Sequence, residues 1–273
     1  MDIKAADVAK LRKMTQAGMM DCKKALIEAD GDYERAVEII REKGKLVASK
    51  RADRSATEGV VVARVVDTTK AYMVCLACET DFVSKNSDFS ATAHRILDAA
   101  IANDAPDMET LLAAKAGDRT VAELVTEKSG QTGEKVELPF YGRIEAAYCS
   151  QYVHINHKLG ALVGFDKVVP EELAHDVAMQ ATAMAPVSIS ETDCPADVLD
   201  KERQIGREQA RLEGKPEAML DKIAEGKVRK FLKESTLLNQ EYVKNPKETV
   251  GQHIASIDKD AHVVAYMRFS LND

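Results

Sequence analysis

The chain has 273 residues, more than one compact domain commonly contains, so two or three domains are expected. Hydrophobic residues make up 45% and charged residues 30%, a composition typical of a globular protein with a highly charged surface. The formal net charge of -7 argues against a general nucleic-acid binder. Residues 1–54 are nevertheless mildly basic, with 13 Lys and Arg against 10 Asp and Glu, whereas the remainder has 25 against 35. This uneven charge favours docking onto another protein.

The cysteines and the first residues indicate that the protein is located in the cytosol. Five cysteines, an odd number, do not suggest a disulfide framework, and they favour a reducing cytosol. The first residues resemble neither a signal peptide nor an Arg-rich transit segment. No window approaches the roughly 20 apolar residues that a membrane span needs. We therefore expect a cytoplasmic protein that does not bind membranes.

Residues 1–42 are predicted to form three short helices around one small core. The second helix is expected to begin after Gly18, and Asp32 can cap the third. Each helix repeats apolar residues three or four positions apart, as one buried helical face requires. These residues are Val8 and Leu11, then Cys22, Ala25, Leu26 and Ala29, then Tyr33, Ala36, Val37 and Ile40.

A basic segment follows these helices. Gly44 is predicted to end the third helix, and residues 45–54 carry Lys50, Arg51 and Arg54. Such a segment could contact RNA or an acidic partner, but a solvated linker is the favoured interpretation.

Two strands and a helix are predicted next. Residues 59–66 are rich in β-branched side chains, and residues 72–78 form a second apolar run after a turn. A helix is expected to follow, with one apolar face made of Phe89, Ala93, Ile96, Leu97 and Ala100. A helical stretch near residues 121–129 then precedes residues 130–133, which are predicted to form a loop.

The order of strand, strand and helix recurs about eighty residues later, which indicates a tandem α+β unit. Residues 143–150 and 159–165 are predicted to be partner strands, and a helix is expected to open at Pro170. A last helix near residues 249–256 and a closing strand at 262–269 complete this second unit. The closing strand is expected to return to the sheet of the second unit.

Residues 196–234 interrupt this second unit. They are rich in charge, and Gly214-Lys215-Pro216 separates two thin apolar stripes. We expect a protruding antiparallel helical hairpin. It could serve as an oligomerisation arm or pack on its own body, and the pattern does not separate these two possibilities.

The segment Glu79–Lys85 (ETDFVSK) lies between the second strand and the following helix. An aromatic ring next to an acid on such a junction suggests a binding role, because function tends to lie on short loops held by rigid elements. The alternative is that Phe82 folds into the core and Asp81 is only a turn residue.

Cys75 and Cys78 form a lone C-x-x-C pair, with His94, His154 or His157 as the other ligands that a zinc site would need. Both cysteines lie on a predicted strand, where residues three apart point to opposite faces. We therefore interpret them as structural.

Two long motifs carry a resemblance to a known family. Residues 11–26 (LRKMTQAGMMDCKKAL) closely resemble the N-terminal signature of the elongation factor Ts family, and Glu79–Lys85 resembles its second signature. Gly214-Lys215-Pro216, residues 223–227 and residues 249–251 resemble later landmarks in the same order.

The resemblance implies an α+β fold with three parts. Residues 1–54 would be a three-helix domain of the ubiquitin-associated type plus a linker. Residues 55–140 and 141–273 would be two related α+β core subdomains, with the helical hairpin inserted at about 190–234.

The resemblance also implies a function. The family promotes exchange of guanine nucleotide on the GTPase elongation factor Tu, without catalytic residues, cofactor or nucleic-acid partner of its own. The matching contact positions are Arg12, Met19 and Met20 in the N-terminal domain, Thr80, Asp81, Phe82 and Val83 in the second signature, and His154 in the second subdomain. Asp81 and Phe82 would intrude near the magnesium and phosphate site of the partner.

Two other function classes remain open from the sequence. The small helical domain could make the chain a pure interaction module that binds ubiquitin-like domains. Cys75 and Cys78 could belong to a thiol or zinc enzyme. For assembly, a homodimer through the helical hairpin and a hairpin that does not dimerise both remain open.

Overall fold

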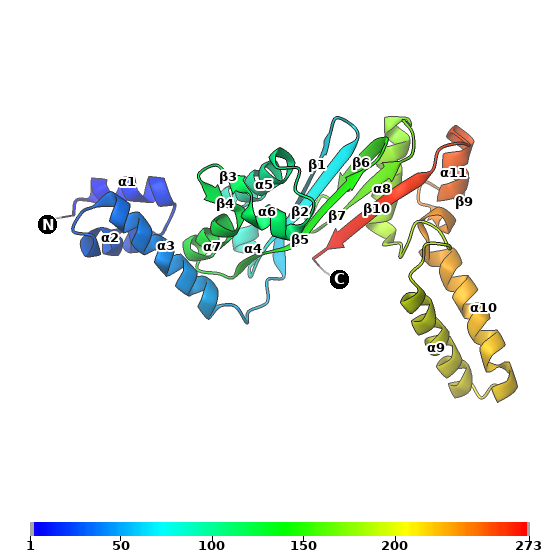
Figure 1. Cartoon of the computed structure of the whole chain (residues 1–273). Helices are drawn as coiled ribbons and strands as arrows, with labels where there is room; N and C mark the ends of the chain where they lie inside the picture. Colours follow the sequence, from blue (N-terminus) through cyan, green and yellow to red (C-terminus); the bar gives the residue numbers. More distant parts are fainter. Residues whose placement is uncertain (1–2, 272–273) are drawn as a thin grey trace.

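The computed structural model describes residues 3–271, which form an elongated molecule with three successive parts (Figure 1). Helices at the N-terminal end are followed by a central part with two sheets, and a helical hairpin projects at the other end. The fold is therefore mixed α and β, as predicted. The predicted domain ends at residues 1 and 273 lie outside the described residues.

The N-terminal part consists of α1 (Ala5–Thr15), α2 (Met19–Glu28) and α3 (Tyr33–Lys50). Asp32 caps α3, because its side chain accepts hydrogen bonds from the N–H groups of Glu34 and Arg35. The predicted apolar faces meet in one small core that includes Val8, Leu11, Ala17, Cys22, Ala25, Leu26, Ala29 and Ala36.

The prediction that Gly44 ends the third helix is wrong, since α3 continues to Lys50 and occupies most of the predicted linker. Gly44 is buried against Gly130 of α7 (Val121–Thr132), and the absence of side chains lets the two helix backbones approach closely. The predicted loop at 130–133 is also wrong, because Gly130 belongs to helix α7 and packs there against Gly44. Helix α7 ends only at Gly133, whose φ of 71° is left-handed.

This contact predicts opposite effects for two similar substitutions. A Cβ on Gly130 would lie 2.5 Å from the Cα of Gly44, so Gly130→Ala is expected to destabilise the protein by about 1–3 kcal/mol. Gly44→Ala meets its nearest atom at 3.5 Å and is expected to be neutral or slightly stabilising, because Ala favours helix over Gly by about 0.5–1 kcal/mol. Urea unfolding measures both, with Gly226→Ala of α10 (Glu217–Ser235), which meets nothing within 4 Å, as control. Equal stabilities of the Gly44 and Gly130 variants would contradict the close contact.

The first sheet has the antiparallel order β1-β2-β5, with β1 (Glu58–Val66), β2 (Lys70–Cys78) and β5 (Val136–Glu145). One face is covered by helices α5 (Ser87–Ala102), α6 (Met108–Ala113) and α7. All five apolar residues predicted for the α5 face are buried. The short strands β3 (Lys115–Ala116) and β4 (Arg119–Thr120) form a small separate ladder.

The second sheet has the antiparallel order β10-β7-β6, with β6 (Tyr148–Val153), β7 (Leu159–Phe165) and β10 (Val263–Ser270). Helix α8 (Glu171–Met184) packs on it, and α11 (Val250–Ile257) contributes to the same hydrophobic core. The closing strand therefore returns to this sheet, as predicted. A 3-10 turn (Leu237–Asn239) and a ladder of β8 (Glu241–Tyr242) with β9 (Asn245–Thr249) lie between the hairpin and α11.

The predicted strand at 143–150 is wrong. Residues 143–145 end β5 of the first sheet, and residues 148–150 begin β6 of the second. Strand β7 therefore pairs with β6 on one side and with β10 on the other, and not with a strand over 143–150. Strand β5 also crosses the predicted subdomain boundary at residue 140. An apolar pattern does not mark the point at which a chain leaves one sheet for the next when both strands bury the same kind of side chain.

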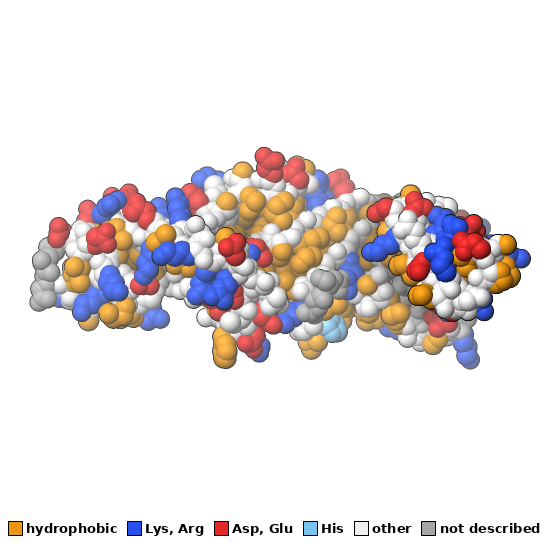
Figure 2. Space-filling model, turned by 90° about the horizontal axis from the view of Figure 1, so that it is seen from below, with side chains coloured by type: hydrophobic (Ala, Val, Ile, Leu, Met, Phe, Trp, Pro, Cys, Tyr) orange, Lys and Arg blue, Asp and Glu red, His pale blue; other side chains and the backbone are white. Residues whose placement is uncertain are grey.

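The two sheets pack face to face, so helices, sheet, sheet and helices form four layers. Val61, Met73 and Cys75 meet Leu162 of the second sheet, whereas the alternate residues of β2 face the helices. Strand β2 is thus buried on both faces, which explains its unbroken apolar run. In Figure 2, hydrophobic side chains gather over the middle of the molecule, between the N-terminal helices and the hairpin.

The hairpin consists of α9 (Ala196–Leu212) and α10 (Glu217–Ser235), as predicted. Gly214 makes the turn with a left-handed φ of 73°. Ion pairs join the two helices, among them Arg203 with Glu225 at 2.5 Å. Leu212 is 80% exposed at the end of α9.

Candidate partner-binding site

Phe82 stands free of the protein core. It lies on α4 (Asp81–Ser84), a helix of one turn between the buried strand β2 and helix α5. The side chain of Phe82 is 87% exposed. The interpretation that Phe82 folds into the core is therefore wrong, and a large apolar side chain in water at this junction is suited to insertion into a partner.

The neighbours of Phe82 divide into anchors and exposed groups. Val83 packs against the core between the first sheet and its helices, and Ser84 donates a backbone hydrogen bond to the carbonyl of Thr80. Asp81 is partly exposed and accepts a hydrogen bond of 2.6 Å from Lys85. This bond lowers the pKa of Asp81, so the carboxylate is ionised at neutral pH.

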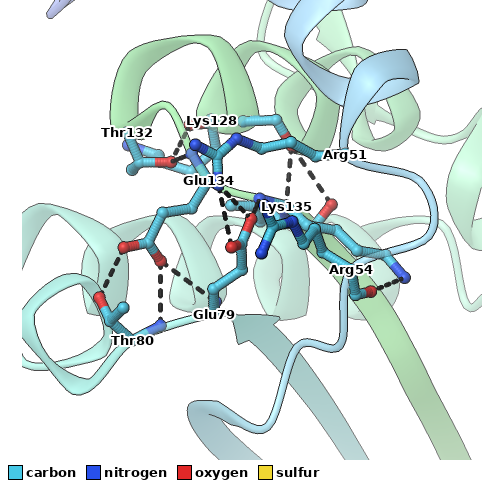
Figure 3. A network of polar contacts seen from close by, with 10 residues as sticks. Arg51, Arg54, Glu79, Thr80, Lys128, Thr132, Glu134 and Lys135 are labelled. Atoms are coloured by element: carbon cyan, nitrogen blue, oxygen red, sulfur yellow. Dashed lines mark hydrogen bonds and ion pairs between the residues drawn. The ribbon is translucent and has the colours of Figure 1, made fainter.

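A network of carboxylates holds the start of α4 (Figure 3). Glu134 accepts hydrogen bonds from the backbone N–H of Glu79 at 3.1 Å and of Thr80 at 3.0 Å, and from the hydroxyl of Thr80 at 2.5 Å. Glu79 in turn accepts from the N–H of Lys135 at 2.6 Å and from Arg51 at 2.8 and 2.9 Å. The bond from Lys135, followed by the contact with Arg51, lowers the pKa of Glu79 against the opposing effect of burial.

Sequence reasoning missed this network. Glu134 directly follows the segment that the pattern predicted to be a loop, Arg51 lies in the predicted linker, and no spacing relates either residue to Thr80. Thr80 and Glu134 are 54 residues apart in the sequence, and only the tertiary fold brings them into contact.

The N-terminal candidates form an exposed surface. Met19 and Met20 are 43% and 64% exposed, so neither fills the small core, which was the alternative for these side chains. Arg12 and Met19 line one shallow hollow together with Asp88 of α5. Because Asp88 lies four residues after Ser84, this hollow extends from the N-terminal helices toward α4.

His154 lies at the end of β6 in the turn toward β7, and it is exposed. Its N–H donates to the carbonyl of Leu159 at 3.0 Å, which closes the turn. The same turn and α4 line one cavity of about 560 Å³, to which Lys85, His157 and Lys158 contribute. The structure thus places the His154 turn beside the segment that carries Phe82.

Cys75 and Cys78 are buried and face opposite sides of β2, as predicted, with Cys75 toward the second sheet and Cys78 toward the helices. Burial raises the pKa of Cys78 to about 12 and raises that of Cys75 further, so both thiols stay protonated. Within residues 3–271 no group of three or more His, Cys, Asp or Glu side chains is arranged to hold a metal ion. Because the two side chains face opposite sides of β2, Cys75 and Cys78 are not placed to bind one metal ion together.

Among the helices of residues 3–271, none is long and apolar enough to cross a membrane.

Comparisons with known proteins point to one family, through a family pattern over the larger part of the chain and relatives that cover nearly all of it. The sequence pattern of the family described as "Elongation factor TS" matches residues 79–273. The chain is 45% identical over 272 residues to an elongation factor Ts of Christiangramia forsetii, covering 98% of each chain. It is 45% identical over 273 residues to an elongation factor Ts of Porphyromonas gingivalis and 43% identical over 270 residues to one of Kineococcus radiotolerans, covering 100% and 97% of this chain and 99% and 97% of those relatives. Since these matches span both the N-terminal helices and the two sheets, the chain belongs to the elongation factor Ts family.

Proposed function

We propose that this chain is a translation elongation factor that binds elongation factor Tu with GDP and promotes release of the GDP. The observation that carries the proposal is the exposed Phe82, held on a one-turn helix between a strand buried on both faces and a long helix. Membership of the elongation factor Ts family supports the identity of the partner. The chain performs no covalent chemistry in this proposal and needs no cofactor, because it acts on the magnesium and GDP that its partner holds.

The proposed mechanism is a conformational wedge. Phe82 inserts between helices of the GTPase near the metal, and Asp81 disturbs the coordination shell of the magnesium. Binding energy spent on one conformation of the GTPase lowers its affinity for nucleotide, and the coupling is reciprocal. A shift from 1:99 to 99:1 between two states needs about 5.5 kcal/mol of differential binding. Asp81 suits this role because it is ionised, although its bond to Lys85 must open first.

The remaining candidates supply grip in this proposal. Arg12, Met19 and Met20 contact the GTPase domain from a three-helix unit of the ubiquitin-associated type, and methionine suits a tolerant apolar contact. Thr80 and Val83 flank the wedge, and His154 reaches a second part of elongation factor Tu. The shared hollow of Arg12 and Met19 supports a common contact surface for these two residues.

The test of this function is a GDP-release assay. Elongation factor Tu is loaded with a fluorescent GDP analogue, mixed with this chain and excess GDP, and followed by stopped-flow fluorescence. A large acceleration of release that saturates with the chain is the expected result. Tight binding to Tu without acceleration would instead favour the pure interaction module, and neither binding nor acceleration would refute the proposed partner.

Arg12→Ala is expected to weaken the complex while release at saturating factor is mostly kept, because Arg12 grips the partner far from the nucleotide. Loss of one exposed interfacial charge typically affects the association rate and costs about 1 kcal/mol, or roughly fivefold in the dissociation constant. Titration of the release rate measures both quantities. Lys45→Ala, an exposed basic residue on α3, is the control. A dissociation constant that Arg12→Ala leaves unchanged would contradict the grip role.

For the hairpin we propose a homodimer contact. Leu212 and Met219 are 80% and 48% exposed near its tip, and pairing would remove them from water. Analytical ultracentrifugation with and without elongation factor Tu tests this arrangement. A mass of one chain at all concentrations would leave the hairpin as a monomeric arm.

A further inference from the structure

We propose that Glu134 is a positioning residue for nucleotide exchange, because its carboxylate holds the first residues of α4 in the orientation that points Phe82 outward. The inference rests on the proposed function, and it adds a residue outside both signature motifs.

The need for such a residue follows from the size of α4. A helix of four residues is far too short to be stable by itself, since helix formation has a costly nucleus. The N-cap residue Thr80 makes no side-chain cap to this helix. Its hydroxyl donates instead to Glu134 at 2.5 Å, so a contact across the fold replaces the local cap.

Glu134 is well suited to hold this segment. Its two oxygens accept three hydrogen bonds, two of them from the backbone of Glu79 and Thr80, and hydrogen bonds to an ionised acceptor are stronger than neutral ones. Gly133 ends helix α7 in a left-handed conformation directly before Glu134, which turns the chain out of the helix at this point. The position of Glu134 is therefore set by a rigid element.

A second carboxylate makes the contact reciprocal. Glu79 accepts from the N–H of Lys135 at 2.6 Å, so residues 79–80 and 134–135 each hold the backbone of the other (Figure 3). Arg51, directly after α3, donates to Glu79 and ties the end of the N-terminal helices to the same point.

The direction of Phe82 depends on this backbone. Its side chain is 87% exposed, so packing of the ring on the body of the protein contributes little to its orientation. The anchor at Val83, the backbone bond from Ser84 to the carbonyl of Thr80 and the carboxylate network hold the turn from which it projects. Loss of the Glu134 charge frees the Thr80 hydroxyl to cap α4 locally, and the turn can then reorient.

The experiment is a double-mutant cycle in the GDP-release assay with the full chain. Glu134→Gln is expected to lower the release rate at saturating factor about tenfold, because a neutral carboxamide oxygen makes weaker hydrogen bonds to the two N–H groups than the ionised carboxylate does. In a Phe82→Ala background the same substitution is expected to change the rate less than about twofold, because a residue that acts through Phe82 has nothing left to position. Glu134→Asp keeps the charge but withdraws it by one methylene, and it is expected to lower the rate as well.

Glu123→Gln is the matched control. Glu123 lies at the other end of α7 and accepts from the N–H of Thr120 in the same type of bond, away from α4. It is expected to leave the release rate unchanged. Hydrogen exchange of the amides of Glu79 and Thr80 serves as a second measurement, and faster exchange is expected in both Glu134 variants.

The proposal would be overturned if Glu134→Gln and Phe82→Ala lowered the release rate independently, so that their effects multiplied. It would also be overturned if Glu134→Gln released GDP at the native rate although the amides of Glu79 and Thr80 exchanged faster. Failure of the proposed function has a different signature, since the unsubstituted chain would then not accelerate GDP release. Failure of the wedge alone would leave Phe82→Ala at the native release rate.

Discussion

Phe82→Ala is expected to lower the rate at which this chain releases GDP from elongation factor Tu by about 30-fold, equivalent to about 2 kcal/mol. The reason is that truncation removes the whole ring from a side chain that contributes to the complex and not to the core, since it is 87% exposed. Stopped-flow release of a fluorescent GDP analogue at saturating factor measures the effect. The unfolding midpoint is expected to stay within the range of an ordinary surface substitution, about 0.5 kcal/mol.

Val168→Ala provides the matched control for this result. Val168 is 69% exposed in the connection between β7 and α8 and lies outside all the proposed contacts. Its variant should release GDP at the native rate. If Phe82→Ala did the same, the wedge would be wrong even though the chain belongs to the family.

Asp176→Ala is expected to destabilise the protein by about 3 kcal/mol. Asp176 is buried on α8 and accepts hydrogen bonds from the hydroxyl of Tyr242 at 2.6 Å and from Lys244 at 2.7 Å. The substitution leaves the buried Tyr242 hydroxyl without its acceptor and Lys244 without its ion pair, which removes one of the contacts that join the β8–β9 ladder to α8. Urea unfolding at neutral pH measures the loss, with Glu172→Ala, an exposed acid on the same helix, as control. A stability equal to that of the control would show that the ladder does not depend on this pair.

The same carboxylate predicts a pH dependence. Burial raises the pKa of Asp176, but the bonds from Lys244 and Tyr242 outweigh it, and the pKa is lowered from the ordinary value of 3.8. A carboxyl whose pKa is lower in the folded state than in the unfolded state stabilises the protein at pH values above its unfolded-state pKa. This stabilisation is lost as the pH falls through the folded-state pKa. The stability difference between the native chain and Asp176→Asn should therefore be constant near neutral pH and shrink below pH 3.8. A difference that grew on acidification would contradict this sign.

Local patterns were sufficient for most of the elements. The apolar spacing on α5 and the cap at Asp32 correctly predicted helices, and the β-branched run at 59–66 correctly predicted β1. Gly44 shows where local rules failed. Glycine usually weakens a helix, but at this position it permits the contact with Gly130, and burial of the α3–α7 interface outweighs its low propensity.

For the candidate site, too, the sequence predicted one part and the structure was needed for the other. The ETDFVSK motif identified Phe82 as a candidate from the sequence, because a contiguous motif can be recognised without knowledge of the tertiary structure. Its exposure was undecided, since an aromatic residue after a buried strand fits burial and exposure equally well. In the structure, Val83 packs against the core at this junction, whereas the side chain of Phe82 is exposed to water.

The sequence by itself determined the α+β class, the helical hairpin at Gly214, and the segment that carries Asp81 and Phe82. These features depend on periodicity, turn residues and contiguous motifs, which act over a few residues. Only the tertiary structure decided that α3 reaches Lys50, that the two sheets pack on each other, and that Glu134 and Arg51 converge on the start of α4. Each of these depends on contacts between residues far apart in the chain, whose free energy no local pattern encodes.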